Sequence, residues 1–252
     1  MGNVLLACDL DGTLIHSYRR RQEGDVCVEW LEGRELSFID PKACRLLRQA
    51  VRKLLFVPVT TRSVEQYRRI RWPEGCEPET AAVANGAVLL RRGAVVEAWR
   101  EKSLEAVRDF RGELERLRGL LSKRFPVCRI VDDAYLLASC RDEEDARRCA
   151  REYRGKTSFT VSPSGRKLYF FPPEINKGTA VRRLRERLGA ELLLCAGDSG
   201  IDLPMLDAAG VAFVPDERLG KKVRAGETAV CPPGKRFAGF VLETALRRAS
   251  FV

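Results

Sequence analysis

The sequence predicts an α/β protein in which a parallel sheet covered by helices carries a second, inserted α+β domain. Apolar runs of about four to eight residues alternate with segments of helical spacing at both ends of the chain. Between residues 101 and 172 the order changes to helix, hairpin, helix, hairpin, which is typical of an antiparallel sheet with helices on one face. The 252 residues, 45% of them apolar, suffice for a large core and this smaller domain.

The first part of the core is predicted from its apolar runs and helix starts. Strands are expected at residues 4–10, 54–61 and 80–90, and helices at 40–53 and 63–70. Asp40 is the expected N-cap of the first helix, with Pro41 in its first turn, and Ser63 begins the second. Pro58 cannot donate to a strand ladder, so we expect a bulge or an unpaired position there.

The middle and the end of the chain complete the pattern. The inserted part is expected to contain a helix at 103–123, strands at 126–132 and 134–139, a helix at 142–155, and strands at 157–163 and 167–173. The core resumes with helices at 176–189 and 200–210 and strands at 191–198 and 211–216. We therefore divide the chain into a core at 1–98 and 173–252 and an inserted domain at 99–172. Residues 16–38 exceed a simple link and are expected to form a flap hairpin beside the mouth of the site.

Composition limits the classes of function. The net charge of +10 suits an anionic substrate, but no aromatic-interleaved basic motif accompanies it, so we expect no nucleic-acid partner. His16 is the single histidine, which argues against a histidine-based zinc site or catalytic triad. The nine cysteines are spread singly and suit the reduced thiols of a cytoplasmic protein. No apolar run approaches the about 20 residues of a membrane span, and we expect neither secretion nor a membrane partner; the oligomeric state is not predicted.

Polar side chains follow four strands of the predicted sheet. They are Asp9, Asp11, Thr60, Arg62, Asn85, Asp198 and Asp202. Lys177 opens the helix before the fourth of these strands. Ligands of open parallel sheets bind beyond the carboxyl ends of the strands, and carboxylates with a lysine and a hydroxyl suit Mg²⁺-assisted phosphoryl chemistry. Asn85 belongs to an Asn-Gly pair, so a turn and a substrate contact are equally open for it.

These motifs occur in an order that resembles the haloacid dehalogenase-like (HAD) phosphohydrolases. "DLDGT" at 9–13, Thr60, Lys177 and "GDSGID" at 197–202 match the sequence of that superfamily's four motifs. The insert between the second and third motifs resembles a C2-type cap, as in Cof-like sugar phosphatases, sucrose-phosphate phosphatase, mannosyl-phosphoglycerate phosphatase and phosphomannomutase. The resemblance covers nearly the whole chain and implies a Rossmann-like core with an inserted αββαββ cap.

The resemblance also implies a role for each motif residue. Asp9 would be the nucleophile that forms an aspartyl-phosphate, and Asp11 would be the general acid and then the base toward water. Thr60 and Lys177 would hold the phosphoryl oxygens. The residues implied for Mg²⁺ are Asp9, Asp11 through its main-chain carbonyl, Asp198 and, in a supporting position, Asp202.

Two positions depart from the pattern of these relatives. Thr61 replaces the glycine of a usual Thr-Gly-Arg, and Ile201 replaces the asparagine of a usual Gly-Asp-x-x-Asn-Asp in the fourth motif, so an amide near the metal and phosphate is missing. The cap is expected to choose the substrate by closing over the core. Arg166 and Lys167 in the cap, with Arg62 on the core side, are candidate substrate contacts, although a charged hairpin turn explains the first two equally well.

The sequence leaves three functions open. The first is an Mg²⁺-dependent phosphomonoester hydrolase that acts on a small anionic phosphorylated metabolite, expected to be a sugar phosphate. The second is a phosphomutase of the phosphomannomutase type. The third is a non-catalytic HAD scaffold that uses its basic face to bind a partner, a function against which the intact motif residues argue.

Overall fold

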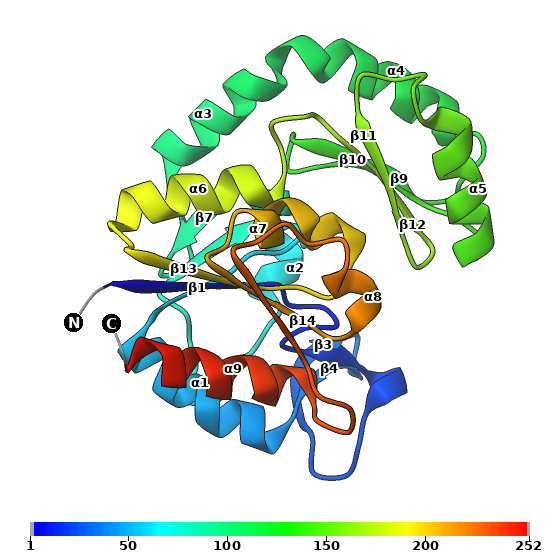
Figure 1. The fold of residues 1–252 in the computed structure, drawn as a ribbon. Coiled ribbons are helices and arrows are strands. Elements are labelled where there is room, and N and C mark those ends of the chain that lie inside the picture. Colours follow the sequence, from blue (N-terminus) through cyan, green and yellow to red (C-terminus); the bar gives the residue numbers. More distant parts are fainter. Residues whose placement is uncertain (1–2, 251–252) are drawn as a thin grey trace.

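The computed structural model describes residues 3–250 and centres on a five-stranded parallel sheet (Figure 1). Its strands, in spatial order, are β15 (Glu227–Val230), β14 (Val211–Val214), β13 (Leu192–Ala196), β1 (Val4–Cys8) and β5 (Leu55–Pro58). Within the described range, no helix combines the length and the apolar character needed to cross a bilayer. The parallel sheet between helices confirms the predicted fold class.

Helices cover both faces of this sheet (Figure 1). On one side lie α1 (Pro41–Lys53) and α9 (Phe237–Ala249), and on the other α6 (Lys177–Leu188) and α7 (Leu203–Asp207). Two shorter helices are α2 (Val64–Arg68) and α8 (Glu217–Gly220). Helices α1 and α2 start where the sequence predicts, because the Asp40 side chain accepts from the Ala43 N–H at 2.8 Å and Ser63 forms a capping box with Gln66. Helix α9 and strand β15 were not predicted.

Pro58 fits into the sheet because its nitrogen faces a place where no ladder bond is needed. Val59 donates its N–H to the Cys8 carbonyl on one side at 2.8 Å, and Thr60 donates to Ala82 on the other at 2.9 Å. Alternate residues of a strand point in opposite directions, so the nitrogen of Pro58 faces the Ala82 side, where pairing begins only at the Val59–Ala82 bridge. Pro58 is the last residue of β5, and its nitrogen lies at the unpaired position that the sequence allowed for.

Residues 80–90 form a hairpin, and the prediction of one continuous strand is wrong. Strand β6 (Thr80–Val83) pairs antiparallel with β7 (Val88–Arg91), which pairs with β8 (Ala94–Val95). Asn85 and Gly86 have φ angles of 58° and 92°, which reverse the chain. A Cβ on Gly86 would lie 2.4 Å from the Ala180 Cβ, so helix α6 packs directly on this turn.

The inserted part has the expected order of helix, hairpin, helix, hairpin. Its sheet has the order β11 (Thr160–Ser164), β12 (Lys167–Phe171), β10 (Tyr135–Ser139) and β9 (Cys128–Val131), all antiparallel. Its helices are α3 (Glu97–Val107), α4 (Arg111–Leu121) and α5 (Glu143–Tyr153). The single helix predicted at 103–123 begins earlier and is divided by a 3₁₀ turn at 108–110. We call residues 99–172 the cap and keep these boundaries as a prediction.

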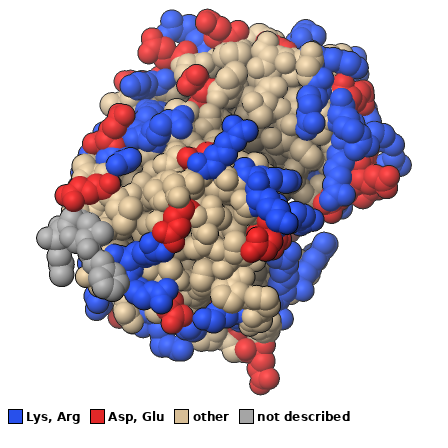
Figure 2. Space-filling model, viewed as in Figure 1, with Lys and Arg blue, Asp and Glu red and all other residues tan. Residues whose placement is uncertain are grey.

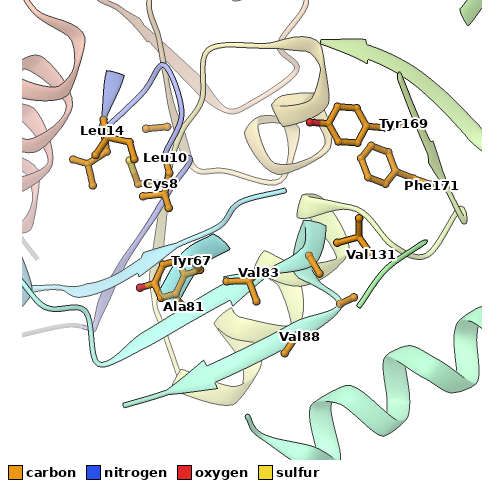
Figure 3. Close-up of a cluster of buried hydrophobic side chains, with 14 of the residues drawn as sticks. Cys8, Leu10, Leu14, Tyr67, Ala81, Val83, Val88, Val131, Tyr169 and Phe171 are labelled. Carbon is orange, nitrogen blue, oxygen red and sulfur yellow. The ribbon is translucent and has the colours of Figure 1, made fainter. Parts of the chain in front are cut away.

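The cap packs against the core beside the second motif. One buried apolar cluster includes Tyr67 and Val83 of the core together with Val131, Tyr169 and Phe171 of the cap (Figure 3). The Tyr135 hydroxyl of the cap donates to the Thr61 carbonyl at 2.5 Å. Because of these contacts, the cap strands lie over the carboxyl ends of the core strands.

Residues 16–39 form the expected flap, as a sheet of three strands. Strand β4 (Arg34–Ile39) lies between β2 (His16–Ser17) and β3 (Val26–Leu31). The Nε2 of His16 lies 2.7 Å from the Asp25 carboxylate, which Arg236 also contacts at 2.6 Å. This cluster ties the flap to the start of α9. A 3₁₀ turn at 18–20 follows β2.

Candidate active site

A buried lysine joins the first and fourth motifs. Asp9 directly follows β1, and its N–H donates to the Ala196 carbonyl of β13 at 2.9 Å. Lys177, the first residue of α6, is 1% exposed, and its Nζ lies 2.5 Å from Asp9 Oδ1 and 2.6 Å from Asp202 Oδ1. We call Asp9, Lys177 and Asp202 the triad. A buried charge is stable only when it is paired, so each group of the triad requires the others.

The charges of the triad act on one another. Burial alone would lower the pKa of Lys177, but Asp202 and Asp9 raise it above its usual value, so the ammonium stays protonated. Burial raises the pKa of Asp9, with neighbouring carboxylates acting in the same direction and Lys177 in the opposite one. Further positive charge near Asp9 would therefore favour the ionised carboxylate that a nucleophile needs.

Asp202 organises the loop of the fourth motif. Its Oδ2 accepts from the Asp198 N–H at 3.2 Å, from the Ser199 N–H at 3.0 Å and from the Ser199 hydroxyl at 2.8 Å. With its other oxygen on Lys177, the carboxylate has polar partners on both sides. These bonds hold Asp198 at the end of β13, facing Asp9.

Asp198 lies against the backbone of the first motif. Gly12 has a φ of +92°, and a Cβ built on it would lie 2.2 Å from Asp198 Oδ2. Only glycine therefore allows the two motifs to approach this closely. Burial, reinforced by Asp202, raises the pKa of Asp198 to about 6.

The carboxylates are grouped closely enough to share a cation. Asp9, Asp198 and Asp202 each offer an oxygen, and these oxygens lie within 4.8 Å of one another. Carboxylate oxygens are the ligands that Mg²⁺ prefers, and a dication offsets both the burial and the mutual repulsion that raise the pKa values of Asp9 and Asp198. The donor set thus fits the metal that the resemblance implies.

Asp11 points away from this group and is held by Arg62. Arg62 Nε and one terminal nitrogen each lie 2.7 Å from an Asp11 oxygen, although 54% of the Asp11 side chain is exposed. Loss of water around Asp11 raises its pKa, but the charge and hydrogen bonds of Arg62 outweigh this effect and lower it. The other side of the guanidinium contacts buried Glu29 of the flap at 2.9 Å, so the flap helps to orient Arg62.

The structure places Thr60 and Asn85 away from the open part of the site. Thr60 is 1% exposed, and its hydroxyl accepts from the Arg62 N–H at 3.1 Å, whereas its neighbour Thr61 lines the cavity. Asn85 is also 1% exposed, forms the turn described above and donates to the Ile175 carbonyl at 2.9 Å. Of the two interpretations of Asn85, this position favours the turn, and its side chain contacts the segment before α6; a direct substrate contact stays a prediction.

A cavity of about 680 Å³ lies between the core and the cap. The predicted residues that line it are Asp9, Asp11, Arg166, Lys167, Lys177 and Asp198. Arg62 instead lines an adjoining cavity of about 220 Å³, which shares Asp11, Thr61, Lys167 and Tyr169 with the larger one. Sequence reasoning missed other polar groups of the larger cavity, which are Ser17, Arg19, Ser139, Asp142, Glu143, Ser164 and Tyr169. Among the cap members, Ser139 and Ser164 lie at strand ends and Asp142 and Glu143 at a helix start, which is the only sequence signal for them, and Tyr169 within β12 has none.

Comparisons with known proteins agree with the motifs. Residues 123–214, which include the third and fourth motifs, match the family model of haloacid dehalogenase-like hydrolases. No curated protein sequence matches the chain.

Solved structures extend the agreement to the whole fold. The sucrose-phosphatase of Synechocystis, solved with sucrose and phosphate, has a TM-score of 0.64 and 17% identity over 98% of both chains. A Thermoplasma acidophilum protein, 0175, has a TM-score of 0.66 and 17% identity over 100% of both. A haloacid dehalogenase-like hydrolase from B. subtilis has a TM-score of 0.58 and 21% identity over 90% of this chain and 94% of its own. The resemblance to HAD-like hydrolases is confirmed, by sequence over 123–214 and by fold over the chain.

Proposed function

We propose that this chain, with the fold and the family motifs of a HAD-like hydrolase, is an Mg²⁺-dependent phosphomonoesterase for a small phosphorylated metabolite. The observation that carries the proposal is the buried triad of Lys177 between Asp9 and Asp202, with Asp198 beside it and a cavity in front. Buried charges that are this costly to assemble cluster at functional sites.

The metal would be held by carboxylates that already face one another. Asp9 and Asp198 would bind Mg²⁺ together with the main-chain carbonyl of Asp11, while Asp202 would hold the Asp198 loop in place. When bound, the ion would orient the phosphoryl group and offset its negative charge.

The side chains of Asp9, Lys177 and Asp11 would carry out the phosphoryl and proton transfers. Asp9 would attack phosphorus to give an aspartyl-phosphate as the bond to the leaving oxygen breaks, and Lys177 would hold Asp9 in line and balance the phosphoryl charge. Asp11 would give a proton to the leaving oxygen and then take one from the water that attacks the aspartyl-phosphate, which releases phosphate and restores Asp9. In the described conformation Arg62 keeps Asp11 ionised, so Asp11 must leave this ion pair, or be protonated within it, before it can act as an acid.

The polar side chains that the cap brings to the cavity favour a polar substrate. Ser139, Ser164 and Tyr169 bring hydroxyl groups to the cavity, and Asp142 and Glu143 bring acceptors at the start of α5. Such groups suit the hydroxyls of a sugar or another polyol, and one structural neighbour is a sucrose-phosphatase. A sugar phosphate is therefore the proposed substrate.

A screen of phosphosugars and an aryl phosphate tests the proposal. We expect the wild type to release free phosphate only with Mg²⁺, Asp9→Asn to lose at least about 100-fold of the rate, and the exposed control Asp109→Asn to keep it. Formation of an isomerised phosphosugar without free phosphate would instead indicate a phosphomutase. Salt-sensitive binding of a macromolecule with no turnover of any probe would indicate a non-catalytic scaffold.

A further inference from the structure

The cap contains a second cavity, which adjoins the catalytic one and is lined by arginines. This cavity has a volume of about 480 Å³, and we call it the arginine groove after Arg124, Arg141, Arg148 and Arg166. Ser139 and Arg166 line both the arginine groove and the cavity at Asp9, so the two spaces are neighbours. Figure 2 shows Lys and Arg side chains gathered on the side of the molecule where α5 lies in Figure 1.

The floor of the arginine groove is built around one buried carboxylate. Asp145 is 6% exposed, its side chain accepts from the Arg141 N–H at 3.3 Å, and Arg148 contacts its other oxygen at 2.5 Å. Despite the burial of the carboxyl group, the Arg141 N–H and the charge of Arg148 lower the pKa of Asp145, so this floor is ionised. Asp145 therefore fixes Arg148 and the start of α5.

The arginines outnumber the carboxylates that could neutralise them. Arg124 pairs with Glu152 at 3.0 Å, and Asp145 is the shared partner of Arg124, Arg141 and Arg148. Arg141 reaches Asp145 only at 4.0 Å, with 79% of its side chain exposed, and within residues 3–250 Arg166 forms no ion pair. Four guanidinium groups against two carboxylates leave an excess of two positive charges around the groove.

A cation does not suit this place, although thiols are present. Cys140, Asp145 and Cys149 have ligand atoms within 4.8 Å of one another. Burial raises the pKa values of both thiols, to about 12 for Cys140, so the thiolates that a metal needs are disfavoured. The surrounding guanidinium groups would also repel a dication. The charge balance therefore favours an anion.

We propose that the arginine groove binds a second anionic group, a phosphate or a carboxylate, of the same substrate whose phosphoryl group lies at Asp9. The planar guanidinium binds such groups through two parallel hydrogen bonds. Arg166, at the boundary of the two cavities, would contact the part of the substrate between them. This inference rests on the proposed phosphatase function and narrows its substrate class to phosphomonoesters with a further anionic group.

Three probes that share a six-carbon chain test the inference. They are glucose 6-phosphate, with one anionic group, glucose 1,6-bisphosphate, with a second phosphate, and 6-phosphogluconate, with a carboxylate. Calorimetry of the wild type in EDTA measures binding without turnover, and phosphate release with Mg²⁺ measures kcat and KM. We expect at least one doubly anionic probe to bind about tenfold or more tightly than glucose 6-phosphate, which corresponds to about 1.4 kcal/mol. Which of the two binds more tightly distinguishes a phosphate site from a carboxylate site.

Arg141→Gln is the informative variant, because its exposed side chain can change without disturbing the fold. We expect it to weaken binding of the preferred doubly anionic probe about 3- to 10-fold, and to leave glucose 6-phosphate unchanged. Arg148→Gln should act in the same direction. The control Arg151→Gln removes the same charge from the exposed side of α5, outside the arginine groove, and should change neither probe.

Three results would overturn the inference. One is equal binding of all three probes by the wild type. Another is an equal effect of Arg141→Gln and Arg151→Gln, which would show that only the overall positive charge of the cap, and not the arginine groove, attracts the probe. The third is binding of RNA or an acidic protein through Arg141 with no preference among the small probes. Absence of phosphate release with Mg²⁺ would contradict the proposed function alone, because the calorimetric preference is measured without turnover.

Discussion

The variant Gly12→Ala tests whether Asp198 belongs to a metal site, provided that its effect on metal binding is distinguished from the effect of backbone strain. Any alanine at a φ of +92° is strained by about 1–2 kcal/mol. The new Cβ would also lie 2.2 Å from Asp198 Oδ2, a distance that real Cβ contacts do not show, so the Asp198 carboxylate must move. The matched control is Gly33→Ala, which has a φ of +76° and no heavy atom within 4 Å of the added Cβ. Both variants share the strain, and only Gly12→Ala displaces a proposed metal ligand.

Thermal unfolding with and without Mg²⁺ measures the difference. A ligand at 100 times its Kd stabilises the folded state by about 2.7 kcal/mol, which raises the Tm of a chain of this size by about 5–10 °C. We expect this shift for the wild type and for Gly33→Ala, and a shift of less than about 2 °C for Gly12→Ala. The reasoning is refuted if Gly12→Ala unfolds reversibly and keeps the full Mg²⁺ shift.

Three further predictions concern stability and charge. Lys177→Met leaves the buried carboxylates of Asp9 and Asp202 without their positive counter-charge and should cost about 3–5 kcal/mol in urea unfolding, whereas Lys42→Met, which breaks an exposed pair, should cost at most about 1 kcal/mol. Glu29→Gln should lower both kcat and stability because it releases Arg62, which orients Asp11, the proposed general acid. Glu65→Gln, which breaks only the exposed pair of Glu65 with Arg69, should change neither, and an unchanged kcat in Glu29→Gln would contradict this role. Burial would raise the pKa of Asp25, but hydrogen bonds from an arginine and a backbone N–H lower it to about 2. The ionised carboxylate therefore stabilises the folded state above the usual pKa of 3.8, and about 2 kcal/mol of this stability is lost as the pH falls from about 4 to 2. Asp25→Asn should remove this loss from the stability measured between pH 4 and 2.

Local patterns predicted most of the residues that meet at the candidate site. Asp9, Lys177 and Asp198 each stand at a strand end or a helix start, and the parallel sheet brings such positions together. Their types alone indicated a charge-compensated site. The burial of Lys177 could be inferred only from the argument that neighbouring carboxylates repel one another unless a positive charge lies between them.

The remaining parts depend on contacts between distant segments. Glu29 has no motif around it, and its role comes from a flap strand that meets Arg62 across the fold. Thr60 and Thr61 are equivalent in composition, and the direction of the chain after β5 decides which one lines the cavity. The Asn-Gly pair allowed a turn at Asn85, but the apolar residues on both sides were interpreted as one strand, whereas the φ angles at Asn85 and Gly86 turn the chain.

The central claim, that Asp9 is the nucleophile, is tested most directly by trapping its phosphorylated form. Borohydride reduces an acyl phosphate, so quenching the enzyme with borohydride during turnover of an aryl phosphate with Mg²⁺ should convert residue 9 to homoserine. Mass spectrometry of the peptide that contains residues 4–13 would detect this change in the wild type and not in Asp9→Asn. Homoserine at position 11 or 198, or none at any aspartate while phosphate is being released, would contradict the account.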